Sequence, residues 1–111
     1  MENKLYGFTI KVSRGEDCDL PAEMQGAYVT CYVGASDYQT AVTKGVAAVS
    51  GMGFVFEDME STIREIPTDS WTEYVKETWP EFADNFPSQE ELFDTIKKGA
   101  VFFGPFAGFR S

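Results

Sequence analysis

The stretch CYVGASDYQTAVTKGVAAVSGMGFVF, residues 31–56, decides the fold because a strand, a helix and another strand follow each other without a linker. Apolar residues recur through its middle at the spacing of one helix face. They are Tyr38, Ala41, Val42, Gly45, Val46 and Val49. Alanine, glycine and valine dominate this face, so we expect the helix to lie close against a sheet. Ser36 and Gln39 have the spacing of a capping box, and Gly51 and Gly53 end the pattern, which predicts a helix over residues 36–50.

Two strands are expected upstream, because apolar and polar residues alternate there. In LYGFTIKV, residues 5–12, one face carries Tyr6, Phe8, Ile10 and Val12, and the other carries Gly7, Thr9 and Lys11. In AYVTCYVG, residues 27–34, one face carries Val29, Cys31 and Val33, and the other carries Tyr28, Thr30 and Tyr32. The segment between them is polar and indicates a loop.

Downstream, residues 54–66 predict a third strand, in which the alternation fails near Asp58. Ser70 and Glu73 have capping-box spacing at the start of a helix that ends before Pro80, and Thr68 or Asp69 are alternative caps. Ser88 and Glu91 repeat that spacing at the start of another helix, with an apolar face of Leu92, Phe93 and Ile96, which Gly99 ends. Residues 100–109, AVFFGPFAGF, predict a last strand whose Pro105 favours an edge or the strand's end.

The element order is therefore β-β-α-β-α-α-β within one domain, residues 1–111. We expect an α/β fold of the α+β type, namely a two-layer sandwich with a mainly antiparallel sheet of about four strands. Two to three helices would cover one face of that sheet. The strand–helix–strand unit predicts a right-handed crossover. A split βαβ arrangement of the ferredoxin-like type would accommodate it, with the first strand pairing as an added hairpin.

Composition excludes several functions. The chain has no histidine, no phosphate-binding loop and no dinucleotide-binding glycine motif, so we expect no enzyme activity, no metal and no cofactor. The net charge is −9, and residues 57–94 alone carry twelve acids against Arg64 and Lys76, a charge of −10. Such a surface disfavours direct nucleic-acid binding and favours a basic protein partner.

The compartment is expected to be the cytoplasm. No apolar stretch approaches the roughly 20 residues of a membrane helix, and the first residues lack the pattern of a signal peptide. Cys18 and Cys31 suit a reducing compartment better than a disulfide. The acids around Cys18, in RGEDCDLPAE, lack the ligand pattern of a calcium-binding loop and predict a solvated loop.

The stretch DSWTEYVKETWPEFADNFPSQEELFD, residues 69–94, mixes acids with large aromatics. Asp69, Glu73 and Glu77 recur every four residues and form an acidic stripe. Trp71 lies on another face with Tyr74 beside it, and Trp79 follows in the connector after the helix. Two interpretations stay open for these aromatics: they cover the sheet as core, or they serve as anchors for a partner.

In size, αβ order, lack of catalytic motifs and this concentration of acid, the chain resembles the small cytoplasmic immunity proteins of bacterial toxin–immunity systems of the contact-dependent inhibition type. The resemblance implies that it binds a toxin, for example a nuclease, and blocks it by occlusion. The partner-binding residues would then be Asp69, Glu73, Glu77, Trp71, Tyr74 and Trp79. One alternative is a phage-type nucleic-acid mimic that inhibits a DNA-binding enzyme. Another is a small-molecule-binding domain that uses the aromatic C-terminal strand.

Overall fold

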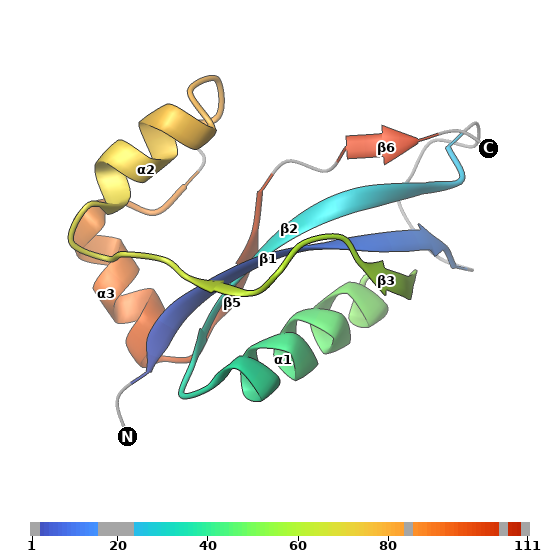
Figure 1. The fold of residues 1–111 in the computed structure, drawn as a ribbon, viewed down its shortest axis with the longest axis horizontal. Coiled ribbons are helices and arrows are strands. Elements are labelled where there is room, and N and C mark those ends of the chain that lie inside the picture. The colour runs from blue at the N-terminus through green and yellow to red at the C-terminus, as the bar shows by residue number, and fades with distance from the viewer. Residues whose placement is uncertain (1–2, 16–23, 84–85, 105–106, 110–111) are drawn as a thin grey trace.

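A computed structural model describes residues 3–15, 24–83, 86–104 and 107–109, which form six strands and three helices (Figure 1). The elements are β1 (Lys4–Arg14), β2 (Gly26–Ala35), α1 (Tyr38–Gly51), β3 (Phe54–Met59), β4 (Arg64–Glu65), α2 (Trp71–Thr78), α3 (Gln89–Lys97), β5 (Val101–Phe103) and β6 (Ala107–Phe109). The class is α+β, as predicted from the sequence. The prediction of four strands is wrong, because two segments that were each expected to form one strand are both divided.

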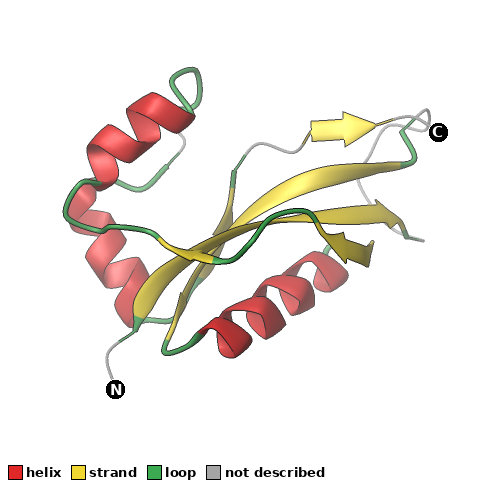
Figure 2. Cartoon of the chain, viewed as in Figure 1, coloured by secondary structure: helices red, strands yellow, loops and turns green. Residues whose placement is uncertain are grey.

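The sheet is antiparallel throughout its described pairings, and its main strand order is β3-β1-β2-β5 (Figure 2). The two central strands pair over almost their whole length, from Lys4 opposite Ala35 to Ser13 opposite Gly26. The short strands β4 and β6 extend this sheet by pairing with β1 and β2. Because β1 lies between β2 and β3, the β2–α1–β3 unit has the split arrangement that the sequence suggested.

The predicted irregularity near Asp58 is confirmed. The ladder between β1 and β3 shifts register between Lys11 and Val12, so that Asp58 faces Lys11 and Phe56 faces Val12. Glu57 is therefore the extra residue of a bulge. Beyond Met59 the chain leaves the ladder and returns only briefly as β4.

One face of the sheet packs against α1. Its core consists of alternate residues of β1 and β2, Phe54 of β3 and small residues of the helix: Tyr6, Phe8, Ile10, Val12, Ala27, Val29, Cys31, Val33, Ala35, Ala41, Val49 and Phe54. The larger β1 and β2 residues among them are those that the sequence pattern assigned to one face. A Cβ atom at Gly45 would lie 2.7 Å from Cζ of Phe8, so only glycine permits this close packing. The prediction that the helix lies close on the sheet is confirmed.

The opposite face of the sheet is covered at one end by α2 and α3, which Figure 1 shows stacked beside each other at the left. A second core lies there, made of Leu5, Tyr32, Ile66, Trp71, Val75, Leu92 and Ile96. The expectation of a two-layer sandwich, with the helices on one face of the sheet, is therefore wrong. The physical reason is that Leu5 and Tyr32 project away from α1 and are both fully buried, which requires a second layer over them.

Two of the three expected helix starts differ in detail from the prediction. Asp37, not Ser36, caps α1, because its Oδ1 accepts a hydrogen bond of 2.7 Å from the backbone N–H of Thr40. This bond lowers the pKa of Asp37. Ser70 precedes α2 as expected, but its side chain makes no capping hydrogen bond.

The third helix follows the sequence closely. The hydroxyl of Ser88 accepts from the N–H of Glu91, whose carboxylate accepts from the N–H of Ser88, so the capping box is confirmed. Gly99 follows the helix with a φ of +68°, the left-handed conformation that glycine adopts readily. Both ends of α3 are thus determined by local sequence.

Candidate functional site

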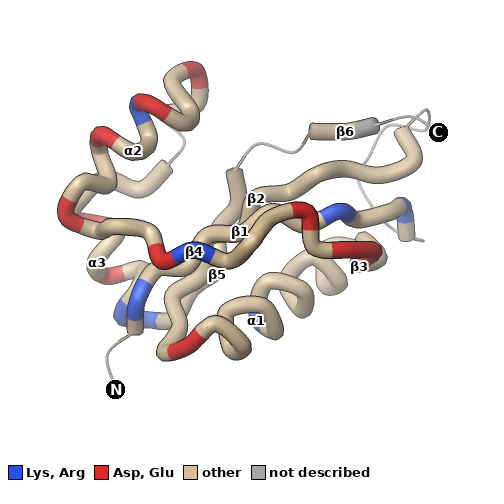
Figure 3. The backbone as a smooth tube through the Cα atoms, in the orientation of Figure 1, with Lys and Arg blue, Asp and Glu red and all other residues tan. Residues whose placement is uncertain are grey.

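Of the predicted acidic stripe, Glu73 and Glu77 lie on the solvent side of α2, whereas Asp69 lies in the turn before Ser70 and is not part of the helix. All three side chains are exposed. The other described acids of residues 57–94 are exposed as well: Glu57, Asp58, Glu60, Glu65, Glu81, Glu90, Glu91 and Asp94. Figure 3 shows acidic positions on β3, beside β4, and on α2 and α3. This excess of exposed acids gives these parts of the surface a negative potential.

Few of these acids are neutralised by a base. Among the described residues, Glu65 pairs with Lys4 at 3.3 Å and Asp94 pairs with Lys98 at 2.9 Å, both at exposed positions. The three acids of the stripe make no ion pair in the described chain. Their charge therefore stays open to solvent and to a partner.

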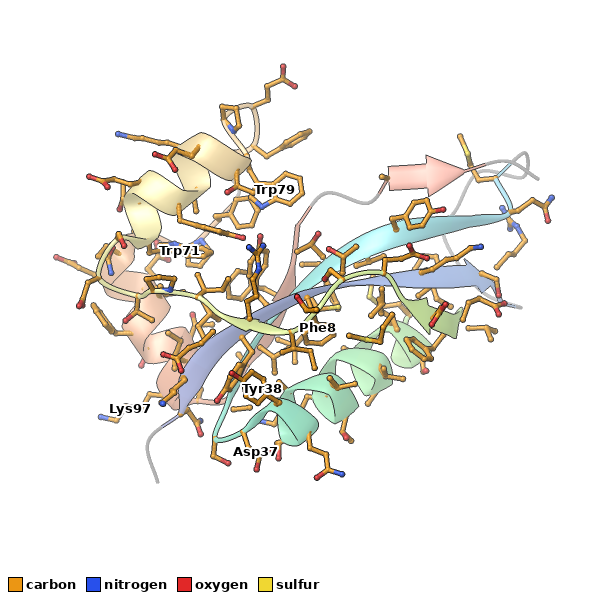
Figure 4. All side chains as sticks on the ribbon, in the orientation of Figure 1. Phe8, Asp37, Tyr38, Trp71, Trp79 and Lys97 are labelled. Carbon is orange, nitrogen blue, oxygen red and sulfur yellow. The ribbon has the colours of Figure 1, made fainter. Side chains whose placement is uncertain are left out.

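The aromatic side of α2 faces the opposite way, toward the sheet. Trp71 is only 1% exposed, and its Nε1 donates a hydrogen bond of 2.8 Å to the carbonyl oxygen of Pro87. Its ring meets Tyr32 edge-on at 5.8 Å and stacks with Tyr74 at 5.5 Å between centroids. Figure 4 shows Trp71 and Trp79 between α2 and the sheet. These contacts attach a short helix to β2 through large side chains.

The hydroxyl of Tyr32 is the polar centre of this aromatic cluster. It accepts a hydrogen bond of 2.7 Å from Nε1 of Trp79, which can only donate, and lies 2.8 Å from the hydroxyl of Tyr74. Tyr32 is fully buried, and this burial raises the pKa of its hydroxyl. The group therefore stays protonated and can donate its hydrogen to Tyr74. The aromatics that the sequence singled out are thus bound together around one strand residue.

The structure assigns Trp71 to the core, because a partner cannot reach its ring without displacing α2. Tyr74 and Trp79 are half-buried, and their role as anchors stays a prediction. The most exposed aromatic side chains described within residues 69–94 are others: Phe82 is 39% and Phe93 is 51% exposed. Sequence reasoning placed Phe93 on the apolar face of its helix, which is wrong, because Leu92 and Ile96 alone make the buried face.

Cys31 and the described phenylalanines of the C-terminal segment have structural roles. Cys31 is a free thiol, fully buried, and burial raises its pKa to about 12, which makes it a poor nucleophile. Cys18 and the acidic loop around it lie outside the described residues. In the C-terminal segment, Phe102 and Phe103 pack against the two different cores, one on each face. They do not line a common pocket.

A surface hollow of about 680 Å³ lies between the start of β1, β4 and the end of α3. Its walls include the Lys4–Glu65 pair, Lys97 and the exposed ring of Phe93. The apolar residues at its base, Leu5, Ile66 and Ile96, are at most 6% exposed. They offer little apolar area to a ligand, so this hollow is a weaker candidate than the acidic surface.

The described residues contain no group of three His, Cys, Asp or Glu side chains placed to hold a metal ion. None of the helices in the described ranges has the length and apolar character needed to cross a membrane. No protein-family model, no curated protein and no solved structure matches this chain.

Proposed function

We propose that this chain is a small acidic binding protein that blocks a basic protein partner, in the manner of an immunity protein that protects the cytoplasm from its cognate toxin. It acts by binding and not by catalysis. Asp69, Glu73 and Glu77 face the partner. A nuclease toxin would suit this role, because an enzyme that holds nucleic acid needs a basic surface.

The observation that carries the proposal is the division of α2 into two sides. Glu73 and Glu77 are exposed and make no ion pair with any described residue, whereas Trp71 and Val75 are buried against the sheet. The aromatic cluster fixes the helix, so the acids are held in place on a well-packed support. Preorganised charge favours binding because less conformational freedom is lost on association.

Occlusion follows from this arrangement. The negative side of the molecule attracts a basic surface and speeds encounter, and the bound protein then covers the groove that nucleic acid would occupy. Because these charges are exposed, salt screens them. At physiological ionic strength the attraction is largely lost beyond a Debye length of about 8–10 Å. The association rate is therefore the quantity that reports on the stripe.

The experiment begins with capture of partners from the native cell by the full chain, followed by association kinetics with the captured protein. The triple variant Asp69→Asn, Glu73→Gln and Glu77→Gln removes three charges with little change of shape. We expect its association rate at low salt to fall roughly tenfold and its salt dependence to flatten, since steering raises such rates by about 10–1,000-fold.

A matched control keeps the charge at the same three positions: Asp69→Glu, Glu73→Asp and Glu77→Asp. This variant should associate at nearly the wild-type rate. Co-expression with the captured partner then tests protection, and the neutral variant should protect less than the control. An equal association rate for both triple variants would remove the acidic stripe from the mechanism.

A further inference from the structure

We infer that the hollow between the start of β1, β4 and the end of α3 binds a small aromatic carboxylate. The ring of this ligand lies against Phe93, and its carboxylate meets the ammonium group of Lys97. The site uses none of the three acids on which the proposed function rests, so it does not depend on that function. It gives the chain a second binding activity, toward a small molecule.

The size and the apolar walls of the hollow suit such a ligand. Its volume of about 680 Å³ lies within the range of roughly 300–1,000 Å³ that is typical of small-molecule sites. Leu5, Ile66 and Ile96 close its base and are almost fully buried. The ring of Phe93 is 51% exposed beside them and supplies the apolar area that the base lacks. A flat aromatic ligand would cover this ring, and aromatic pairs attract each other beyond the area that they bury.

The polar groups of the walls favour an anion. Glu65, the one acid among the described lining residues, is paired with Lys4 at 3.3 Å. Lys97 makes no ion pair with any described residue. The hydroxyl of Thr68 makes no hydrogen bond within the described ranges, where only its backbone carbonyl has partners. An ammonium and a hydroxyl are thus left without a partner, and both can donate to a carboxylate.

The charge around the hollow differs from that of the whole chain. Its described walls carry two lysines and one glutamate, a net charge of +1, whereas the chain carries −9. Figure 3 shows basic positions at the start of β1 and at the end of α3, where Figure 4 labels Lys97. The carboxyl end of a helix disfavours an anion, but the carbonyl of Ile96 already accepts from the side chain of Asn3 and the N–H of Gly99. The charge next to the ligand therefore favours a carboxylate.

The probe is benzoate, added to the isotopically labelled full chain and followed by NMR. Benzamide has the same ring without a charge, and benzamidinium has the same ring with a positive charge. We expect benzoate to shift the backbone amides that line the hollow and to bind about threefold more tightly than either analogue, from one exposed charge pair. Added salt should weaken the binding of benzoate and leave that of benzamide unchanged.

Two pairs of variants locate the site. Lys97→Gln should weaken benzoate about threefold. Its control is Lys98→Gln, which removes the same charge from a residue that pairs with Asp94 at 2.9 Å and does not line the hollow. Phe93→Ala should also weaken benzoate, whereas Phe82→Ala, which removes an exposed ring outside the hollow, should not. Retained circular dichroism would show that all four variants are folded.

Several outcomes would overturn this inference. Benzamide or benzamidinium binding as tightly as benzoate would mean that the hollow does not select an anion. Equal effects of Lys97→Gln and Lys98→Gln would reduce the binding to general attraction by charge. An absence of saturable shifts at the lining amides would mean that the hollow is only an irregularity of the surface. None of these results bears on the association kinetics of the α2 variants, so the two proposals fail separately.

Discussion

Removing the hydroxyl of Tyr32 tests whether the aromatic cluster fixes α2 to the sheet. In Tyr32→Phe the ring keeps its place, but Nε1 of Trp79 loses its acceptor at 2.7 Å and the hydroxyl of Tyr74 loses its partner at 2.8 Å. The lost oxygen is fully buried. The substitution therefore isolates two hydrogen bonds from the packing around them.

Each of these hydrogen bonds contributes about 1 kcal/mol to stability, so the variant should lose about 2 kcal/mol. The loss of stability is larger if the indole N–H of Trp79 cannot turn to water, because this donor then stays buried without an acceptor. In a domain of this size, 1 kcal/mol corresponds to a fall of roughly 4–8 °C in Tm. A decrease of about 10 °C is therefore expected.

The assay is urea unfolding followed by circular dichroism and by tryptophan fluorescence. Both tryptophans of the chain lie in or beside this cluster, so fluorescence reports on it directly. Tyr38→Phe is the matched control, because it removes the same atom from a side chain that is 53% exposed. Its effect should stay within about 0.5 kcal/mol, as for most surface substitutions.

A double-mutant cycle sharpens the test. Trp79→Phe removes the donor of the same hydrogen bond, so its effect and that of Tyr32→Phe should be coupled by about 1 kcal/mol. A Tyr32→Phe variant as stable as the Tyr38→Phe control would refute the reasoning. So would strict additivity in the cycle, since it would mean that the two side chains do not interact.

Three other predictions concern stability. Gly45→Leu should cost about 1–3 kcal/mol, because even a Cβ there would lie 2.7 Å from Phe8; an unchanged urea midpoint would contradict the close packing of α1. Ser88→Ala should cost about 1 kcal/mol in thermal unfolding, and Ser88→Thr, which keeps an acceptor, should cost less. The thiol of Cys31 keeps its proton to a higher pH in the folded chain than in the unfolded one, with a pKa of about 12 against 9.0. Its stabilising effect is complete below pH 9 and falls by about 1.4 kcal/mol per pH unit as the pH rises from 9 toward 12; Cys31→Ala should flatten that slope in urea unfolding.

Local patterns in the sequence predicted much of the fold. The alternation in β1 and β2 identified the face that packs on α1, and the small residues around Gly45 identified the helix that covers it. The capping box at Ser88 and the stop at Gly99 were also found, because both depend on a few adjacent residues. Such local patterns are easy to recognise, because a single hydrogen bond or a single backbone angle limits which residues can occupy the position.

The second layer could not be predicted, because its signal is spread over distant residues. Leu5 and Tyr32 lie on the face of the two strands for which the alternation predicted no covering layer, and only their joint burial requires one. The start of α1 was ambiguous for a different reason. Ser36 and Asp37 are both good capping residues, and a shift of one position exchanges them.

The aromatics in and after α2 could be interpreted either as core or as interface residues, because helical spacing alone does not show which side of a helix meets the sheet.

A comparison of free energies explains why α2 is stable despite the repulsion between its acidic residues. Glu73 and Glu77 are like charges four residues apart, and their repulsion costs a few tenths of a kcal/mol. Burial of Trp71 outweighs it, since truncating a core tryptophan to alanine typically costs about 3–5 kcal/mol. An isolated helix of eight residues would not be stable in water, so α2 depends on its contacts with the sheet. Neutralising the stripe should therefore leave the fold intact or slightly more stable, and any loss of partner binding in that variant can be attributed to the missing charge.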